Sequence, residues 1–490
     1  MPARPASRIA TISYTSITQS NQLLGMSLYR PASRMWPESK FRRCCKPAGC
    51  RVWAVGHRSV NWADIIVRNL ELMRTITLIA VMTATAGLAL PAMRPAAAVV
   101  AMNFYVNPAH GSDAAAGTRA APVRTIQQAM DRAVPGTVIH LAAGTYSENV
   151  VTRTNGRPAR RIVIEGPALG TATLYGTGHV MTIRNSYYTL RGFSIDGQQQ
   201  VEIGHPVRTW PTAISQIARF KASIAPLVNN DRLIYIDSGS AAAGVTGTII
   251  DHMTLTGAGG ECIRERNNAT DNVVKNSVIR YCGMYTGFAR GMFAYHNGEG
   301  IYIGTSPRSS DLPGSQNDQS SGNSVEDDTI TTYGSECFDV KENAHDNTLS
   351  NSLCADNTEP VQDQGSNVEL RGYANTVSKN RIAASAGYGL KISSDTTAED
   401  LGHNNITSNT FRGQPAGALY DASSSVSGSM CGNAVGPGSA AGDFPKHPGW
   451  SSACQNAGHQ AAVTTSAMHG PERPMASGRS GPTFQSRSSD

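Results

Sequence analysis

The sequence predicts an all-β, single-domain fold, a right-handed parallel β-helix over roughly residues 103–435 with an N-terminal capping helix. Two short strand patterns recur along the chain, and the spacing between their copies is irregular. In a solenoid, each coil buries its apolar positions on the next coil while loops of variable length leave the strands. The composition agrees with this fold. A chain of 490 residues can build one large core, and 16% charged residues are too few for a coiled coil or a charged disordered chain.

The first recurring strand has an apolar third position and mostly an apolar eighth position. Its copies are NVVKNSVI from Asn272, NSVEDDTI from Asn323, NTLSNSLC from Asn347, NTVSKNRI from Asn375 and NNITSNTF from Asn404. They lie 24 to 51 residues apart, as expected for variable loops on a constant strand core. We expect Asn at the turns, where it tolerates left-handed backbone and bonds to its own chain.

The second recurring strand carries charged residues at alternate positions. Its copies are ECIRER from Glu261, EGIYIG from Glu299, ECFDVK from Glu336, SNVELR from Ser366 and YGLKIS from Tyr388. Alternation along a strand directs successive side chains to opposite faces. It predicts an inward set of Phe338, Val340, Val368 and Leu370, and an outward set of Asp339, Lys341, Glu369 and Arg371.

The start of the predicted domain adds a short amphipathic helix before the first strands. Its apolar face holds Ile126, Ala129, Met130 and Ala133, and a β-rich strand begins at Val138. We expect this helix to cover the open end of the core and to protect the first strand edge. Residues 198–232 break the strand rhythm and are predicted to be an inserted loop.

The chain before residue 99 is predicted to be absent from the mature protein. Residues 73–98 have a short basic start at Met73-Arg74, an apolar run and small residues up to Ala98, which is typical of a secretory signal peptide. A transmembrane helix is the alternative, but the apolar run is short and interrupted. Residues 1–72 are interpreted as an untranslated or dispensable upstream segment, with a basic pro-segment as the alternative. We therefore expect a secreted, extracellular monomer without membrane insertion after signal removal.

Cysteine content and the C-terminal composition agree with export. Six cysteines follow the signal, an even number compatible with three disulfides, and pairing of neighbours would give separations of 20, 17 and 23 residues. Sequence alone leaves the connectivity open. Residues 436–490 form a C-terminal segment rich in Ser, Gly and Pro, which we expect to be mostly disordered after about residue 455.

The charge distribution argues against a nucleic-acid partner. The whole chain has a formal net charge of +6, but residues 1–98 contain 13 Lys+Arg and 3 Asp+Glu. The remaining residues hold 29 basic and 33 acidic side chains, a net charge of −4. The predicted mature protein is mildly acidic, so any attraction for an acidic polymer must be local.

The chain resembles the pectin-lyase-like superfamily of right-handed parallel β-helices. The segment YVNPAHGSD from Tyr105, followed by residues 125–146, looks like the entry coil of bacterial exported β-helix proteins. The resemblance covers most of the predicted mature chain and implies the fold. This fold hosts lyases, hydrolases, epimerases and plain binding proteins, so activity must come from the site.

The outward charges predict a catalytic site for β-elimination on a uronic-acid polysaccharide. Lys341 and Arg371 should stack on adjacent coils about 4.8 Å apart, with Gly304 leaving open space one coil earlier. We expect the like charge to lower the pKa of Lys341, so that it can remove the proton next to the sugar carboxylate. Arg371 would bind the acidic group or protonate the leaving oxygen.

A calcium site is expected beside these cations. Glu261, Glu299 and Glu336 align at the start of the second strand, and carboxylates on neighbouring coils repel unless a cation lies between them. Oxygen ligands of this kind suit Ca²⁺. The expected ligands are Glu299, Glu336 and Asp339.

These residues also resemble the site of the alginate lyase and chondroitinase B family of polysaccharide lyases. In that family a catalytic lysine follows a calcium-binding glutamate on one coil, and an arginine within an Arg-His-Gly signature stands on the next. Lys341 matches the lysine, Glu336 the glutamate and Arg371 the arginine. The chain departs at Gly372-Tyr373, which follows Arg371 in place of His-Gly, and at Gly334, which occupies the position of a second calcium glutamate.

Two other functions remain open from the sequence. One is a non-catalytic carbohydrate-binding or adhesion β-helix, in which aromatic residues of the 284–333 region stack on sugars (Tyr285, Phe288, Phe293, Tyr295, Tyr302 and Tyr333). The other is a polygalacturonase-type hydrolase, which needs a pair of carboxylates such as Asp327-Asp328, although this pair aligns with turn residues. His296 is a further candidate acid, base or ligand, or a polar loop residue.

Overall fold

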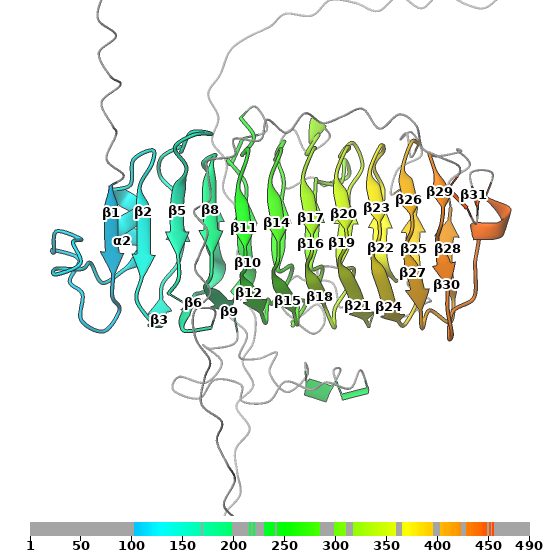
Figure 1. The fold of residues 1–490 in the computed structure, drawn as a ribbon, viewed down its shortest axis with the longest axis horizontal. Helices are drawn as coiled ribbons and strands as arrows, with labels where there is room; N and C mark the ends of the chain where they lie inside the picture. The colour runs from blue at the N-terminus through cyan, green and yellow to red at the C-terminus, as the bar shows by residue number, and fades with distance from the viewer. Residues whose placement is uncertain are drawn as a thin grey trace, which may run out of the picture. The chain divides into compact units, whose positions relative to one another are not determined.

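Parallel pairing between strands one coil apart organises the chain (Figure 1). The computed structural model describes residues 102–167, 170–197, 215–216, 219–220, 230–240, 243–284, 298–309, 317–358, 365–394, 402–422, 428–447, 450–451 and 453–454. The predicted signal peptide, the segment before it, His296 and the tail from residue 455 lie outside these residues. None of the helices in the described part has the length and apolar character of a membrane-crossing segment.

Three parallel sheets, named A, B and C here, form the walls of a right-handed β-helix, and the chain visits them in the order A, B, C in successive coils. The predicted fold class is therefore confirmed. In the described residues, sheet A contains β1 (Asn103–Val106), β2 (Val138–Leu141), β5 (Ile162–Glu165), β8 (Tyr188–Arg191), β11 (Ile249–Asp251), β14 (Val273–Lys275), β17 (Ser324–Glu326), β20 (Thr348–Ser350), β23 (Thr376–Ser378), β26 (Asn405–Thr407), β29 (Met430–Cys431) and β31 (Trp450–Ser451).

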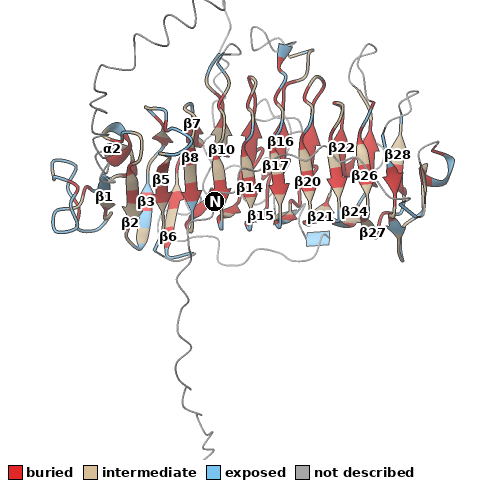
Figure 2. Ribbon diagram, turned by 45° about the horizontal axis from the view of Figure 1, so that its top comes forward, coloured by how far each residue is buried: buried red, intermediate tan, exposed pale blue. Residues whose placement is uncertain are grey.

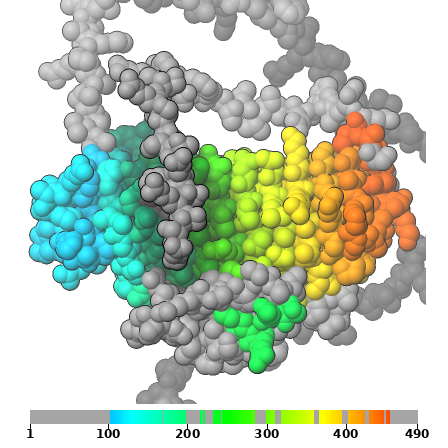
Figure 3. Space-filling view, turned by 60° about the horizontal axis from the view of Figure 1, so that its bottom comes forward, coloured from blue at the N-terminus to red at the C-terminus, as the bar shows by residue number. Residues whose placement is uncertain are grey.

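The other two sheets follow the same order along the solenoid. In Figure 3 the colour of the described residues accordingly runs from blue through green and yellow to orange along the solenoid. Sheet B contains β3 (Gly144–Ser147), β6 (Ala172–Tyr175), β9 (Ser194–Asp196), β12 (Thr254–Thr256), β15 (Val278–Arg280), β18 (Thr329–Thr331), β21 (Leu353–Asn357), β24 (Arg381–Ser385), β27 (Thr410–Arg412) and β30 (Ala434–Val435). Sheet C contains β4 (Val150–Val151), β7 (Gly178–Ile183), β10 (Asn230–Ile236), β13 (Ile263–Glu265), β16 (Ile301–Ile303), β19 (Phe338–Val340), β22 (Ser366–Leu370), β25 (Tyr388–Ile392) and β28 (Gly417–Asp421). Strand β10 begins inside the stretch predicted as an inserted loop.

The apolar positions of both predicted strand repeats face the core, as expected. Most strand residues are buried, as the colouring of Figure 2 shows, and their apolar side chains form one core cluster. The third and eighth positions of the first repeat are buried core residues, namely Val274, Val325, Leu349, Val377, Ile406, Ile279, Ile330, Cys354, Ile382 and Phe411. The inward set of the second repeat is fully buried as well. Burying these apolar surfaces is the main source of stability in such a core.

The first coil is closed by helix α2 (Ile126–Asp131), which packs against β1, β2 and β4. Thr125 caps the helix by accepting a hydrogen bond from Gln128 N at 3.2 Å. The Glu148 carboxylate accepts the N–H groups of Ile126 and Gln127 at 2.8 and 2.9 Å. All four residues of the predicted apolar face are buried. At the other end, a 3-10 helix (Phe444–Lys446) buries Phe444 against Phe411.

Buried asparagine side chains connect successive coils. Asn272, Asn323 and Asn347 donate from Nδ2 to Oδ1 of the next asparagine, at 3.1, 2.9 and 3.2 Å, and the last acceptor is Asn375. The expected left-handed backbone occurs at other asparagines of the repeat, Asn276 and Asn351, with φ of 53° and 52°, whereas in the ladder it lies one residue earlier, for example at Asp346 with φ of 55°. The expected reason for these asparagines was therefore incomplete, because they stabilise the coil stacking through side-chain hydrogen bonds.

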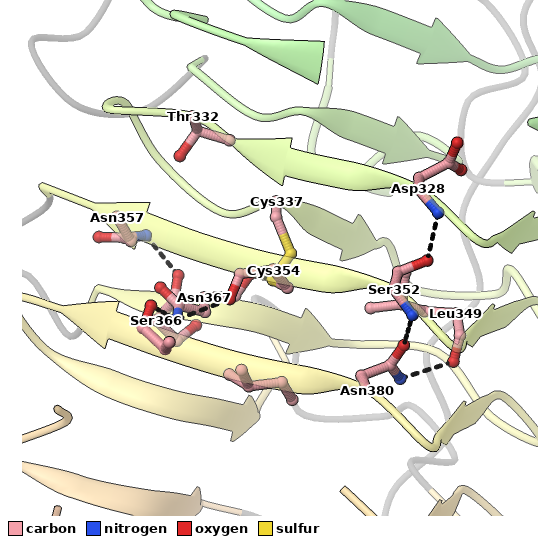
Figure 4. Close-up of a disulfide and its surroundings, with 12 residues drawn as sticks. Asp328, Thr332, Cys337, Leu349, Ser352, Cys354, Asn357, Ser366, Asn367 and Asn380 are labelled. Carbon is pink, nitrogen blue, oxygen red and sulfur yellow. Dashed lines mark hydrogen bonds between the residues drawn. A yellow bond between two sulfur atoms is a disulfide. The ribbon is translucent and has the colours of Figure 1, made fainter. Parts of the chain in front are cut away.

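The three disulfides join neighbouring cysteines. They are Cys262–Cys282, Cys337–Cys354 and Cys431–Cys454, with sequence separations of 20, 17 and 23. Figure 4 shows the bond between Cys337, just before β19, and Cys354 in β21. Disulfides of this kind are typical of proteins in oxidising, extracellular compartments.

Asp328 takes part in a second ladder at the turn between sheets A and B (Figure 4). Its Oδ1 accepts a hydrogen bond from Ser277 N at 2.6 Å, and Ser352 and Asn380 follow on the next coils. Its Oδ2 is buried without a hydrogen-bond partner among the described residues. Burial, with the nearby charges of Asp327 and Glu326, raises the pKa of Asp328 to about 8. The Asp327-Asp328 pair therefore belongs to a structural turn, as its alignment with turn residues predicted.

We predict that Asp328→Asn stabilises the protein at pH 8 by about 1 to 3 kcal/mol, because it removes a buried, half-satisfied carboxylate. Asn380, in the same ladder, donates from its side-chain amide to the Leu349 carbonyl at 2.9 Å. An asparagine at position 328 would bring the same kind of donor. A carboxyl group with a raised folded-state pKa destabilises the fold progressively as pH rises from about 4 to about 8, so the gain should nearly vanish at pH 4. Urea unfolding at pH 4, 6 and 8 measures this. Asp327→Asn, at an exposed position, is the control and should change stability much less; equal gains would contradict the prediction.

Candidate functional site

The outer face of sheet C carries a row of polar side chains in strict register. Arg264 on β13 pairs in register with Tyr302 on β16, Tyr302 with Asp339 on β19, and Asp339 with Glu369 on β22. Lys391 on β25 continues the row. Although they point away from the core, all five residues are buried. Charged groups in such surroundings interact more strongly than exposed charges do.

Lys341 and Arg371 come together on this face through a shared carboxylate. Lys341 Nζ lies 3.6 Å from Asp339 Oδ2, and Arg371 Nη1 lies 3.3 Å from the same oxygen. Arg371 also donates to Glu369, with its Nε 2.8 Å from Oε1 and its Nη2 2.5 Å from Oε2. The two cations therefore flank Asp339. Lys341 experiences the negative charge of Asp339 as well as the positive charge of Arg371.

Lys391 and Ser393 contact the Glu369 carboxylate on one side and Arg371 on the other, and these contacts fix the position of the Arg371 guanidinium. Lys391 Nζ lies 2.9 Å from Glu369 Oε1, and Ser393 Oγ donates to the same oxygen at 2.5 Å. Because Glu369 is buried and paired with two cations, it orients the Arg371 guanidinium toward Asp339.

Three carboxylates meet beside these cations. One oxygen each from Glu299, Glu336 and Asp339 lies within 4.8 Å of the other two, and all three residues are buried. This is the predicted ligand set. Two oxygens bound to one Ca²⁺ at 2.3–2.6 Å are at most about 5 Å apart, so the spacing fits a shared cation.

The electrostatics of the acidic cluster also favour a cation. Glu299 Oε2 is buried and has no hydrogen-bond partner among the described residues. Burial, with the charges of Glu261, Glu336 and Asp339, raises the pKa of Glu299 well above its ordinary value. Burial and Asp339 likewise raise the pKa of Glu336, whose Oε2 accepts a hydrogen bond from Ser335. Neutralisation by a bound ion would relieve this cost.

Glu261, the third glutamate of the predicted column, is committed elsewhere. Arg232 on β10 forms an ion pair with Glu261, with Nε 2.9 Å from Oε2 and Nη2 3.0 Å from Oε1. Asp231 pairs with the same arginine and with His179. The predicted column of three glutamates therefore divides: Glu299 and Glu336 join the cluster, while Glu261 belongs to an ion-pair network.

Tyr302 lies between two cations in the middle of the site. The Arg264 guanidinium is 3.4 Å from the Tyr302 ring centroid, and Lys341 Nζ is 5.0 Å from it. Burial raises the pKa of Tyr302, while Lys341 and Arg264 act in the opposite direction. The Tyr302 hydroxyl is therefore protonated at neutral pH, and the positive charges of Lys341 and Arg264 near its ring would favour the phenolate when it forms.

The structure corrects the expectation for Gly304 and gives a reason for the departure at Gly334. Gly304 does not leave open space, because a Cβ there would lie 3.0 Å from Ala344 Cβ and 3.3 Å from Lys341 Cβ. At Gly334, a Cβ would come within 2.6 Å of the carbonyl oxygens of Cys282 and Gly298. The backbone packing at Gly334 excludes a glutamate, and Asp339 and Glu299 supply the additional carboxylates.

Sequence reasoning treated Tyr302 only as one of several aromatic residues and did not assign Glu369 and Lys391 to the site. The repeat register contained the signal, because Tyr302, Asp339, Glu369 and Lys391 occupy the same position in successive copies. Of the other predicted aromatics, Tyr333 stacks on Tyr281 with 4.8 Å between ring centroids. The remaining four lie outside the described residues.

Comparisons with known proteins find local and fold-level similarity. A family model described as "Protein of unknown function (DUF1565)" matches residues 109–153. Pectate lyase PEL9 of Emericella nidulans is 52% identical over 50 residues, which is 10% of this chain and 12% of that enzyme. The match thus spans a small part of the length of that relative.

Two solved structures are similar in architecture. The alginate lyase from Paenibacillus sp. str. FPU-7 has a TM-score of 0.48 and 16% identity, covering 65% of this chain and 94% of that one. Pectate lyase Pel9A has a TM-score of 0.43 and 12% identity, covering 68% of this chain and 79% of that one.

We predict that Arg371→Ala costs about 3 kcal/mol of folding free energy, because it leaves the buried carboxylates Asp339 and Glu369 undercompensated. Lys341→Ala, whose ion pair with Asp339 is longer at 3.6 Å, should cost clearly less. Urea unfolding at neutral pH measures both. Arg381→Ala, exposed on sheet B, is the control and should stay within about 0.5 kcal/mol of wild type. If Arg371→Ala matches this control, the ion-pair network does not hold the site.

Stacked parallel strands in three sheets, a buried apolar interior and a capped first coil are all present. By fold, the chain is a right-handed parallel β-helix protein.

Proposed function

We propose that this protein is a secreted polysaccharide lyase that cleaves a uronic-acid-containing polysaccharide by β-elimination. One observation carries the proposal: an amine, Lys341, and a phenol, Tyr302, lie together on the outer face of sheet C, 5.0 Å from Nζ to the ring centroid. Arg371 and the acidic cluster flank them. The reaction needs a base, an acid and positive charge opposite the substrate carboxylate.

The roles follow from the chemistry of each group. Lys341 Nζ takes the proton from the carbon next to the sugar carboxylate. The electron pair forms the carbon–carbon double bond, and the bond to the glycosidic oxygen breaks. Tyr302 donates its hydroxyl proton to that oxygen, and the resulting phenolate recovers a proton from the Lys341 ammonium through solvent.

Arg371 serves better as a carboxylate-binding group than as the acid. Its guanidinium is held by Glu369 and Asp339 and keeps its charge at any pH of interest. This charge and the shared Asp339 contact place it beside Lys341, where the substrate carboxylate must lie for its neighbouring proton to reach Nζ.

A divalent cation fits the cluster of Glu299, Glu336 and Asp339, whose oxygen donors match Ca²⁺. When bound, it would supply positive charge that stabilises the substrate carboxylate as it becomes a dianion. One observation supports a cation here: the Oε2 atom of Glu299 is buried without a hydrogen-bond partner among the described residues.

Incubation of the purified protein with alginate, polygalacturonate and chondroitin, with and without Ca²⁺, should yield unsaturated sugar ends on at least one polymer, followed by ultraviolet absorbance. Lys341→Ala should lower kcat by about 10² to 10⁴-fold, and Tyr302→Phe by about 10²-fold, the range for loss of an acid or base. Lys275→Ala, on sheet A, should leave activity unchanged.

The outcomes separate the candidate functions. Full activity in Lys341→Ala would refute the assigned chemistry. New reducing ends without unsaturation would indicate a hydrolase. Binding of a polymer without any product would indicate a carbohydrate-binding β-helix.

Added Ca²⁺ should raise the Tm of the chelator-treated protein, because an ion that binds only the folded state stabilises it by about 2.7 kcal/mol at 100 times its Kd. Mg²⁺ should have a weaker effect, since it needs stricter octahedral geometry. Glu299→Gln should reduce the Ca²⁺ shift, whereas Asp131→Asn, exposed on helix α2, should keep it. An equal shift in both variants would place the ion elsewhere.

A further inference from the structure

Arg264 is a buried cation whose hydrogen-bonding capacity is not used by the fold. It lies on β13 in the outward row of sheet C, between Tyr235 on β10 and Tyr302 on β16. The residue is 4% exposed, and both Nε and Nη1 are buried without a hydrogen-bond partner among the described residues. Burying a guanidinium with unmet donors is costly, so a ligand acceptor at this position would offset a real penalty.

The acidic residue nearest to Arg264 already has a cationic partner. Glu261 Oε1 is 3.9 Å from Arg264 Nε, beyond hydrogen-bond distance, while Arg232 donates from Nη2 to the same oxygen at 3.0 Å and forms an ion pair with Oε2. Glu299, on the next coil, belongs to the acidic cluster, where a bound cation would take up its charge. Arg264 therefore remains an undercompensated positive charge.

Stacking fixes the orientation of this guanidinium. At 3.4 Å from the Tyr302 ring centroid, it lies against the aromatic face. A stacked guanidinium keeps its N–H donors in the plane, where they match the two oxygens of a carboxylate. Tyr302 thus orients Arg264 without consuming its donors.

We propose that Arg264 binds the carboxylate of a uronate residue of the polysaccharide, in a subsite two coils from Lys341. Both side chains approach the Tyr302 ring, with the Arg264 guanidinium 3.4 Å and Lys341 Nζ 5.0 Å from its centroid, so the two cations belong to neighbouring parts of one surface. The inference rests on the proposed function for the class of polymer, but it concerns binding and does not require cleavage. It makes Arg264 a specificity-determining residue for chains that carry a second uronate near the cleavage point.

The test measures binding in a Lys341→Ala background, which prevents turnover. The probes are hexasaccharides of galacturonate and of mannuronate, and the same oligosaccharides with their carboxyl groups reduced to alcohols. Adding Arg264→Met should weaken binding of at least one acidic probe by about tenfold or more, the effect of losing a charge-assisted hydrogen bond. Affinity for the reduced probes should not change. Arg264→Lys should bind the acidic probe with intermediate affinity, because it keeps the charge but loses the planar fork.

Arg191→Met, on sheet A, is the matched control and should bind as the parent does. Thermal unfolding identifies variants that have lost the fold, and Arg264→Lys then carries the test. Equal affinity of Arg264→Met and its parent for the acidic probes, or no binding of any acidic probe, overturns the inference. If the wild type cleaves no polymer but acidic probes bind in an Arg264-dependent way, the lyase proposal fails and the subsite stands.

Discussion

Hydrogen bonding between parallel strands of successive coils determines where every side chain of the site lies. Tyr302 and Asp339 are far apart in sequence, yet the β16–β19 register puts them side by side. A slip of one residue would turn the outward row into the core, and the buried interior forbids this. The asparagine ladder adds side-chain hydrogen bonds between the same coils. Stability and site geometry therefore depend on one register.

That register also forces charges together, and the outer face of sheet C shows how they are balanced. Asp339 lies between Lys341 and Arg371, and Glu369 lies between Arg371 and Lys391. Neighbouring coils are about 4.8 Å apart, so a cation and a carboxylate in adjacent positions pair without rearrangement. Where carboxylates adjoin without enough cations, at Glu299 and Glu336, burial raises their pKa values. Carboxylates with pKa values shifted in this way are typical of functional sites.

Much of this arrangement was predictable from the repeats, because residues at the same position of successive copies lie side by side on neighbouring strands. Aligning ECFDVK with SNVELR was enough to place Lys341 beside Arg371 and to turn Phe338 inward. Contacts outside the repeat were not predictable. The partner of Glu261 is Arg232, in a stretch whose sequence breaks the rhythm, and the packing at Gly304 depends on how the backbone closes around Ala344. The stacking of Arg264 on Tyr302 required side-chain positions that register alone does not specify.

The charge balance of the site explains why an acidic polymer and a cation belong together here. Among the residues that the structure describes, the ion pairs and the acidic cluster on sheet C join five cations, Arg232, Arg264, Lys341, Arg371 and Lys391. They join these to six carboxylates, Asp231, Glu261, Glu299, Glu336, Asp339 and Glu369. At a pH high enough to ionise all six carboxylates, including Glu299, Glu336 and Glu369 with their raised pKa values, the five positive and six negative charges leave −1, which disfavours a polyanion. One divalent cation changes the sum to +1. Because the sign of a local field governs the approach of a charged polymer, a single bound ion would turn the same surface from repulsive to attractive.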